Sequence, residues 1–423
     1  MEGVTHDYSD MPLVPLLNIF KYLDLNSRCN TMAVCRKWRS VMMCESIWHE
    51  TTYDVPGKWK EPTLALERIA EDFGGWHRKV TIRIKGSDPR VAFTTMNLLC
   101  VLSELLPRRI QCLTIQCVQH GGLCRHGENL ALCIRNFFDK SPNSYGGELA
   151  GLLRVDLSCM TISVYDPVIT TLFNNHGQWL THVNLQNRQV HCRLTAAAMR
   201  TAVKMLTHIE DFRTFMACFD NDALKAIISS NQGSLRHLSF LCRYADAFRQ
   251  NRPTESTWQA LNRKWPEAAV TLTFSRGYPP DKFRVIMLPS VPLKTVCFEQ
   301  PINAITIALI TDMYKTKLHK VVLRSKPVEN INNQLANLVL DSAHLRVLYV
   351  MHNLEITTAT LITERRPKIK HNISIHNDEV RFDPVPEQES SRPFVPNKTI
   401  PALIKFPYPD LWNRRDAEFS SSL

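Results

Sequence analysis

The sequence predicts an α/β fold in which a short helical unit is followed by a curved solenoid of strand–turn–helix repeats. Three observations support this prediction: helical spacing of apolar residues in 11–50, one apolar frame that returns between residues 77 and 375, and dense prolines in 376–423. A chain of 423 residues also exceeds what one hydrophobic core usually organises. We therefore divide it into an N-terminal segment 1–10, a three-helix unit 11–50, a linker of helix and loop 51–76, about ten irregular repeats in 77–375, and an extended tail 376–423.

The composition predicts a folded chain without a membrane span or a secretory signal. Apolar residues make up 44% and charged residues 22%, which is ordinary for folded proteins. The apolar stretch from Ile302 to Ile310 is too short to cross a bilayer, which needs about 20 residues. The first residues lack a basic start followed by an apolar block, so no signal peptide is expected. Thirteen cysteines then predict reduced thiols in the cytoplasm and/or the nucleus.

The first folded unit, 11–50, has apolar residues at helical spacing. Between residues 13 and 23 they step mostly by three and four, which predicts one stripe on a helix. The stripe consists of Leu13, Leu16, Leu17, Phe20 and Leu23. Asp24 and Ser27 interrupt it and offer caps for a second helix, which carries Val34, Cys35, Trp38 and Val41. So small a unit buries little on its own, so part of its apolar face is expected to serve a partner.

In order and spacing this unit resembles the F-box motif. That motif runs Leu-Pro-x-Glu-x-Leu-x-x-Ile-Phe-x-x-Leu, then Val-Cys-x-x-Trp, then Leu-Trp. The matching residues are Met11, Pro12, Leu16, Ile19, Phe20, Leu23, Val34, Cys35, Trp38, Ile47 and Trp48. Three positions depart from it: Val14 replaces an acidic residue, Pro15 follows it, and Arg28 stands where the motif is usually apolar. The alternative is a generic three-helix bundle whose tryptophans all lie in the core.

Behind the linker, the frame apolar-x-x-apolar-x-apolar keeps returning. Its copies are Ile110-Leu113-Ile115, Leu152-Val155-Leu157, Leu180-Val183-Leu185, Leu235-Leu238-Phe240, Leu293-Val296-Phe298, Leu318-Val321-Leu323 and Leu345-Leu348-Val350. The two double gaps in this series each contain a weaker copy, Ile209-Phe212 and Leu272-Phe274. Val80-Ile82-Ile84 is expected to start the series and Ile373-Ile375 to end it. The period of about 24 to 29 residues resembles that of leucine-rich repeats.

The chemistry of the frame supports the repeat prediction. Its alternating half predicts a short strand that shows every second side chain to a core. Helical stretches separate the strands, at 93–106, 166–174, 194–206, 222–230, 305–314 and 330–340. One such unit cannot close a core, but stacked copies bury a continuous one. Parallel strands would then line a concave face whose outward residues contact a partner; another solenoid or an open α/β sheet is the alternative.

An F-box followed by leucine-rich repeats is the layout of substrate receptors of SCF-type cullin–RING ubiquitin ligases, and the resemblance extends over 1–375. It implies that 11–50 docks on the Skp adaptor, and through it on a cullin–RING ligase, while the arc holds an unidentified protein substrate. Adaptor-binding residues would be Pro12, Leu13, Leu16, Ile19, Phe20, Leu23, Val34, Cys35, Trp38 and Trp48. Substrate contacts would be Arg154, Asp156, Thr181, Asn184, Arg236, Ser239, Lys294, Thr295, Lys320 and Arg346. The chain itself would be a non-catalytic receptor without a cofactor.

Other interpretations remain open at this point. One is an adaptor-binding scaffold that acts outside a ligase, and another is a repeat protein that binds nucleic acid or an acidic surface, since the formal net charge is +11. A zinc site near residues 112–133 is not expected, because the cysteines and histidines there include no Cys-x-x-Cys pair. For the tail, packing against the repeat array and a mobile partner-binding segment are the two alternatives.

Overall fold

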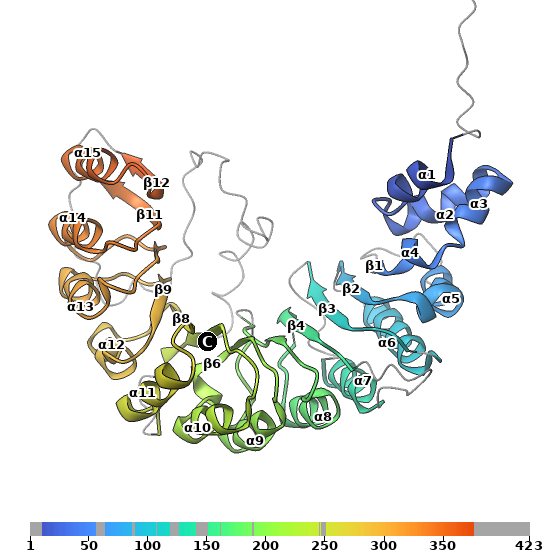
Figure 1. The fold of residues 1–423 in the computed structure, drawn as a ribbon, viewed down its shortest axis with the longest axis horizontal. Helices are drawn as coiled ribbons and strands as arrows, with labels where there is room; N and C mark the ends of the chain where they lie inside the picture. The colour runs from blue at the N-terminus through green and yellow to red at the C-terminus, as the bar shows by residue number, and fades with distance from the viewer. Residues whose placement is uncertain are drawn as a thin grey trace, which may run out of the picture.

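The computed structural model describes residues 11–55, 64–86, 89–106, 108–118, 127–140, 151–160, 162–187, 190–244, 246 and 251–375. These residues form a crescent whose strands line the concave side and whose helices cover the convex side (Figure 1). The predicted fold, N-terminal helices followed by an α/β solenoid, is therefore confirmed. The predictions for the segment 1–10 and the tail 376–423 lie outside the described residues.

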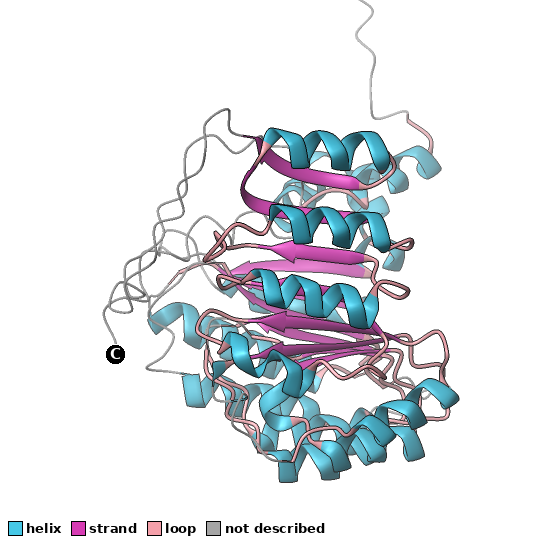
Figure 2. Cartoon of the chain, turned by 90° about the vertical axis from the view of Figure 1, so that its left-hand side faces the viewer, coloured by secondary structure: helices cyan, strands magenta, loops and turns pink. Residues whose placement is uncertain are grey.

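Within the described part of the chain, twelve parallel strands form one sheet in sequence order. They are β1 (Glu50–Val55), β2 (Lys79–Ile84), β3 (Cys112–Cys117), β4 (Arg154–Cys159), β5 (His182–Asn184), β6 (Asp211–Phe215), β7 (His237–Cys242), β8 (Ala269–Phe274), β9 (Leu293–Phe298), β10 (Lys320–Leu323), β11 (Val347–Leu354) and β12 (Lys370–Ile375). Figure 2 shows the strand arrows stacked and pointing the same way. Parallel neighbours need a crossover connection, and the helices supply it.

The helices form a short N-terminal group and then a convex layer. The group consists of α1 (Leu13–Phe20), α2 (Leu25–Val34), α3 (Arg36–Met42) and α4 (Glu45–Trp48). The layer consists of α5 (Leu64–Phe73), α6 (Pro89–Glu104), α7 (Gly127–Asp139), α8 (Asp166–His176), α9 (Ala196–Ala202), α10 (Asn221–Ser230), α11 (Glu255–Lys264), α12 (Phe283–Ile286), α13 (Ala304–Tyr314), α14 (Asn332–Asp341) and α15 (Ile356–Arg365). The helices expected at 166–174, 222–230 and 305–314 are close to α8, α10 and α13.

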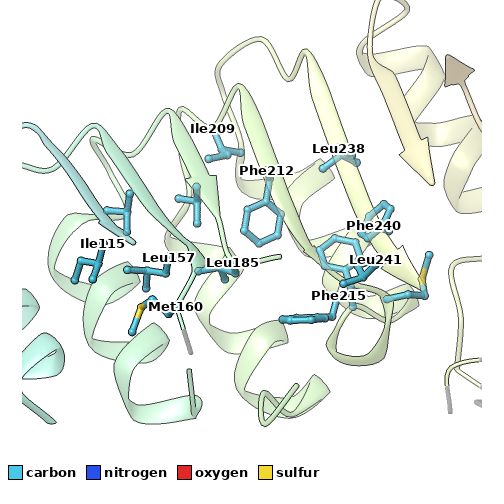
Figure 3. Packing of buried hydrophobic residues seen from close by; sticks show 14 of the residues in the cluster. Ile115, Leu157, Met160, Leu185, Ile209, Phe212, Phe215, Leu238, Phe240 and Leu241 are labelled. Atoms are coloured by element: carbon cyan, nitrogen blue, oxygen red, sulfur yellow. The ribbon is translucent and has the colours of Figure 1, made fainter. Parts of the chain in front are cut away.

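The core lies between the sheet and the convex helices. The predicted frame residues fill it, as Ile115, Leu157, Leu185, Phe212, Leu238 and Phe240 illustrate (Figure 3). All six are at most 1% exposed, including Phe212 of a copy that the sequence marks only weakly. Each repeat therefore closes its core against its neighbours, which is the physical basis of a solenoid.

The sheet starts earlier than the frame indicates. Strand β1 pairs in register with β2, from Glu50 opposite Lys79 to Val55 opposite Ile84, although 51–76 was expected to be a linker of helix and loop. Its inward side chains are Thr51, Tyr53 and Val55, which are buried but only partly apolar. Because two of these three core positions hold a threonine and a tyrosine, the strand lacks the aliphatic pattern by which the other strands are predicted.

Candidate functional site

Local signals in the sequence fold residues 11–50 into four short helices. The Oδ1 of Asp24 accepts a hydrogen bond from the Ser27 N–H at 2.8 Å and caps the start of α2. Cys35 is extended between α2 and α3, and its sulfur accepts from the Trp38 N–H at 3.4 Å. These caps turn the chain between helices, so that α3 packs against both α1 and α2.

The inner side of this unit is a closed core. Leu16, Phe20 and Trp48 are almost fully buried. The Trp48 ring stacks on Phe73 of the first repeat, with centroids 3.9 Å apart, and its Nε1 donates to the Met42 carbonyl at 2.7 Å. These three residues were predicted to contact the adaptor directly; in this structure they are buried in the unit, with Phe20 packed against Trp38 and Trp48 stacked on Phe73.

Several apolar side chains on the surface of the same helices are exposed. Leu13 is 50% exposed, Ile19 49% and Val34 60%, and Pro12 is exposed as well. The remaining predicted adaptor residues, Leu23, Cys35 and Trp38, are half-buried. We call Leu13, Val14, Ile19 and Val34 the N-terminal apolar face.

Exposed apolar side chains are concentrated in this unit. Sixteen large apolar residues are exposed among the residues that the structure describes, and six of them lie between Leu13 and Met43. The other ten are spread from residue 93 to residue 356. Single exposed apolar residues are ordinary, whereas a cluster on one small unit is typical of an interaction surface. The exposed cations Arg36, Lys37 and Arg39 on α3 add a positive charge to this unit.

Arg28 lies at the junction between the helices and the sheet. Its side chain is nearly buried, and its two terminal nitrogens donate to the carbonyls of Lys21 and Glu50, each at 3.1 Å. The guanidinium carbon lies 5.6 Å from the centre of the Trp48 ring. Burial lowers the pKa of Arg28 from its usual value, against the opposing charge of Asp24. One cation therefore contacts the end of α1, the core of the unit and the start of β1.

A buried histidine lies beneath the same junction. Nδ1 of His77 is 2.9 Å from the Trp48 carbonyl, and Nε2 is 2.6 Å from the Tyr53 hydroxyl. Because a carbonyl can only accept, Nδ1 carries the proton and Nε2 accepts from Tyr53. Burial lowers the pKa of His77 to about 4, so the ring is neutral near pH 7.

The concave face was predicted to hold the substrate, and the register now places its residues. Arg154, His182, Asp211 and His237 occupy the same outward position on β4, β5, β6 and β7. Of the predicted contacts, five lie at outward strand positions; they are Arg154, Asp156, Asn184, Thr295 and Lys320. Three others, Thr181, Arg236 and Arg346, lie one residue before a strand, and Lys294 is the second residue of β9.

Ser239 is also at an outward position, but it is not available to a partner. It is buried because the Gln186 side chain lies across it, with Nε2 donating to the Ser239 hydroxyl at 3.0 Å and to the Thr214 carbonyl at 3.1 Å. Ser239, a predicted substrate contact, is thus covered by Gln186 in this structure. Gln186, which the sequence did not single out, takes its place on the surface.

The centre of the concave face carries a fixed polar network. Asp211 accepts from Arg213 through both carboxylate oxygens, at 2.9 and 2.7 Å, and from Nδ1 of His237 at 3.2 Å. Nε2 of His237 is 2.8 Å from the Thr271 hydroxyl. Burial alone would raise the pKa of Asp211, but the hydrogen bonds from His237 and Arg213 outweigh it and hold the pKa well below its usual range. The network spans three repeats and presents an oriented, rigid surface.

Two features are absent from the described residues. No group of three or more His, Cys, Asp or Glu side chains in that part of the chain could hold a metal ion. In the same part, every helix is too short or too polar to span a bilayer.

Comparison with known proteins identifies the N-terminal unit. A family model described as F-box-like matches residues 8–53. No curated protein matches the chain. A solved structure described as the "Crystal structure of Rad7 and Elc1 complex in yeast" aligns with a TM-score of 0.44 and 12% identity, over 89% of this chain and 88% of that chain. That likeness is too distant to support an argument about function.

Proposed function

We propose that this chain, which carries an F-box-like domain ahead of a parallel strand–helix repeat array, is the substrate-recognition subunit of an SCF ubiquitin ligase. The N-terminal helices dock on a Skp-type adaptor, which links them to a cullin–RING ligase. The concave face holds a protein substrate. The chain acts as a non-catalytic receptor in the cytoplasm and/or the nucleus.

The observation that carries the proposal is the N-terminal apolar face. Leu13, Ile19 and Val34 each leave about half of their surface or more in water, although the F-box-like domain has a complete core beneath them. Covering such side chains gains about 25 cal/mol for each Å² of apolar area buried. A separate protein that supplies a complementary groove is the simplest source of that gain.

The arc supplies the second half of the function. Its concave face displays oriented polar groups across successive strands, including Arg154, Asn184 and the Asp211 network. Hydrogen bonds orient Asn184 and the Asp211 network, so a protein that fits these groups loses little additional entropy on binding. Holding substrate and adaptor on one body raises the effective concentration of a substrate lysine near a separately delivered ubiquitin thioester.

Adaptor capture tests the proposal. The full chain should co-purify with a Skp-type adaptor and a cullin, and the triple variant Leu13→Asp, Ile19→Asp, Val34→Asp should lose both. A matched control is Ile305→Asp, since Ile305 is 65% exposed on α13, far from the N-terminal helices in sequence. If the wild-type chain captures no adaptor, or if the control loses it equally, the proposal fails.

The same purified protein distinguishes the proposed function from two alternatives. A scaffold that works outside a ligase would capture the adaptor but no cullin, and no bound protein would be ubiquitinated. A nucleic-acid-binding arc would bind an oligonucleotide with an affinity that falls steeply with salt, because binding releases counterions. Binding that is absent or independent of salt removes that alternative.

A further inference from the structure

The contacts at the junction between the N-terminal helices and the sheet attach different helices to the sheet. The Trp48–Phe73 stack fixes α4 against α5, and the N–H groups of Arg78 and Lys79 donate to the His49 carbonyl at 2.9 and 2.8 Å. These contacts attach the chain immediately before β1. Arg28, on α2, extends the attachment to the helices that carry the N-terminal apolar face.

Arg28 donates hydrogen bonds to two backbone carbonyls that are far apart in the sequence. The Lys21 carbonyl lies where α1 ends, and the Glu50 carbonyl lies where β1 begins. A guanidinium is planar and presents its N–H groups in a fixed fork, so the two acceptors are held in one relative position. The Trp48 ring beside the guanidinium restricts its tilt.

The cation is not placed there for stability alone. It is nearly buried, its direct acceptors are neutral carbonyls, and its Nε has no hydrogen-bond partner. A buried charge carries a desolvation cost, and Arg28 has hydrogen bonds to two neutral carbonyls but none to a carboxylate to offset it. An apolar residue, which the F-box motif usually has here, would also pack on Trp48 but would not hold either carbonyl.

We propose that Arg28 is a positioning residue that fixes the angle between the N-terminal apolar face and the concave face of the arc. This inference rests on the proposed function, because the angle matters only when the two surfaces hold two proteins at once. Arg28 takes no part in contacting either protein. It determines where a substrate held by the arc lies relative to the adaptor.

A distance measurement across the junction tests this role. Spin labels on unnatural amino acids at Lys37 of α3 and Arg68 of α5, both exposed, avoid the native cysteines. In the full wild-type chain we expect one narrow distance distribution. In Arg28→Met the distribution should widen at least twofold, while the thermal unfolding midpoint stays within a few degrees. In Arg28→Lys an intermediate width is expected, since an ammonium reaches the carbonyls without the planar fork.

Arg108 provides a matched control. It is buried, donates to the carbonyls of Phe137 and Lys140 at 2.8 Å each, and lies 4.7 Å from the Phe137 ring centre. It therefore has the same chemistry but lies between two repeats, outside the labelled junction. Arg108→Met should leave the Lys37–Arg68 distribution unchanged. An Arg28→Met distribution as narrow as that of the wild type, with the protein folded, overturns the proposal.

Adaptor capture is measured separately on the same variants. Arg28→Met should keep the adaptor affinity within about threefold, because Arg28 is buried and is not one of the residues of the N-terminal apolar face. A wild-type chain that shows the narrow distribution but captures no adaptor would refute the proposed function and leave the geometric role of Arg28 intact. Loss of capture in Arg28→Met with a narrow distribution would refute the positioning role, since Arg28 would then support the docking surface itself.

Discussion

The F-box-like helices and the repeat array use apolar residues in different ways. In the array, the frame residues of every strand from β3 to β11 are buried, and none of them is more than 2% exposed. In the helices, the predicted adaptor-binding residues divide: Leu16, Phe20 and Trp48 are core, whereas Leu13, Ile19 and Val34 are exposed to water. The frame residues of the array thus close a core within the chain itself. A unit that leaves apolar surface exposed is suited to binding a partner.

The largest effect is expected where the array closes its core. Phe212→Ala should lower the free energy of unfolding by about 3 to 5 kcal/mol, because it removes a fully buried ring that packs against Phe173 and Phe219. Chemical denaturation measures the change. Phe93→Ala, at a ring that is 51% exposed, is the control and should cost far less. Equal losses in the two variants would contradict the division between core and surface.

Acid should weaken the junction. His77 has a folded-state pKa of about 4, compared with an ordinary value of 6.5. Between these two pH values the histidine is protonated in the unfolded chain but neutral in the folded chain. Stability is therefore complete above pH 6.5 and falls as the pH approaches 4, by about 1.4 kcal/mol for each unit of pKa difference. His176, buried with a pKa also lowered to about 4, contributes in the same direction. Denaturation curves between pH 7 and pH 4 should show a slope that His77→Gln reduces.

Removing a contact between repeats should have a smaller effect. Arg366 donates to the carbonyls of Val339 and Ser342, each at 3.1 Å, and so satisfies groups that α14 leaves open at its end. Arg366→Ala should cost about 1 to 3 kcal/mol, because those carbonyls lose their donor. Hydrogen exchange should then accelerate in α14 and α15 but not in α1 to α4. Faster exchange throughout the chain would contradict the nearest-neighbour character of the array.

The smallest effect on stability, and the sharpest contrast, is expected at the N-terminal apolar face. Ile19→Asp should change the free energy of unfolding by no more than about 0.5 kcal/mol, since the side chain is half in water. Adaptor capture should nevertheless drop at least tenfold, because a charge would have to be buried in the interface. Thermal unfolding and pull-down assays on the same preparation check both expectations. A strongly destabilised Ile19→Asp would show that this residue belongs to the core.

The sequence predicts the regular parts of this fold well, because periodicity is a local property. The frames at Leu152, Leu235 and Leu293 fall on strands, and helices follow them. Strand β1 was not predicted, since its core positions include Thr51 and Tyr53. Thr51 and Tyr53 become core residues only because β2 pairs with β1, and that pairing is not visible in the local sequence.

The candidate site was harder to predict, because exposure depends on residues distant in sequence. Leu13 and Leu16 belong to one helical stripe, yet only Leu16 is covered by the rest of the unit. Ser239 lies at an outward strand position but is covered by Gln186, which comes from two strands away. Arg28 was noted only as a departure from a motif, and its two carbonyl partners could not be inferred from spacing.

Hydrogen exchange of the full chain with and without a Skp-type adaptor tests the central claim most directly. The account predicts slower exchange in α1 and around Val34 when the adaptor is added, with the strands of the arc unchanged. Slower exchange confined to the concave strands, or no change anywhere at saturating adaptor, would contradict it.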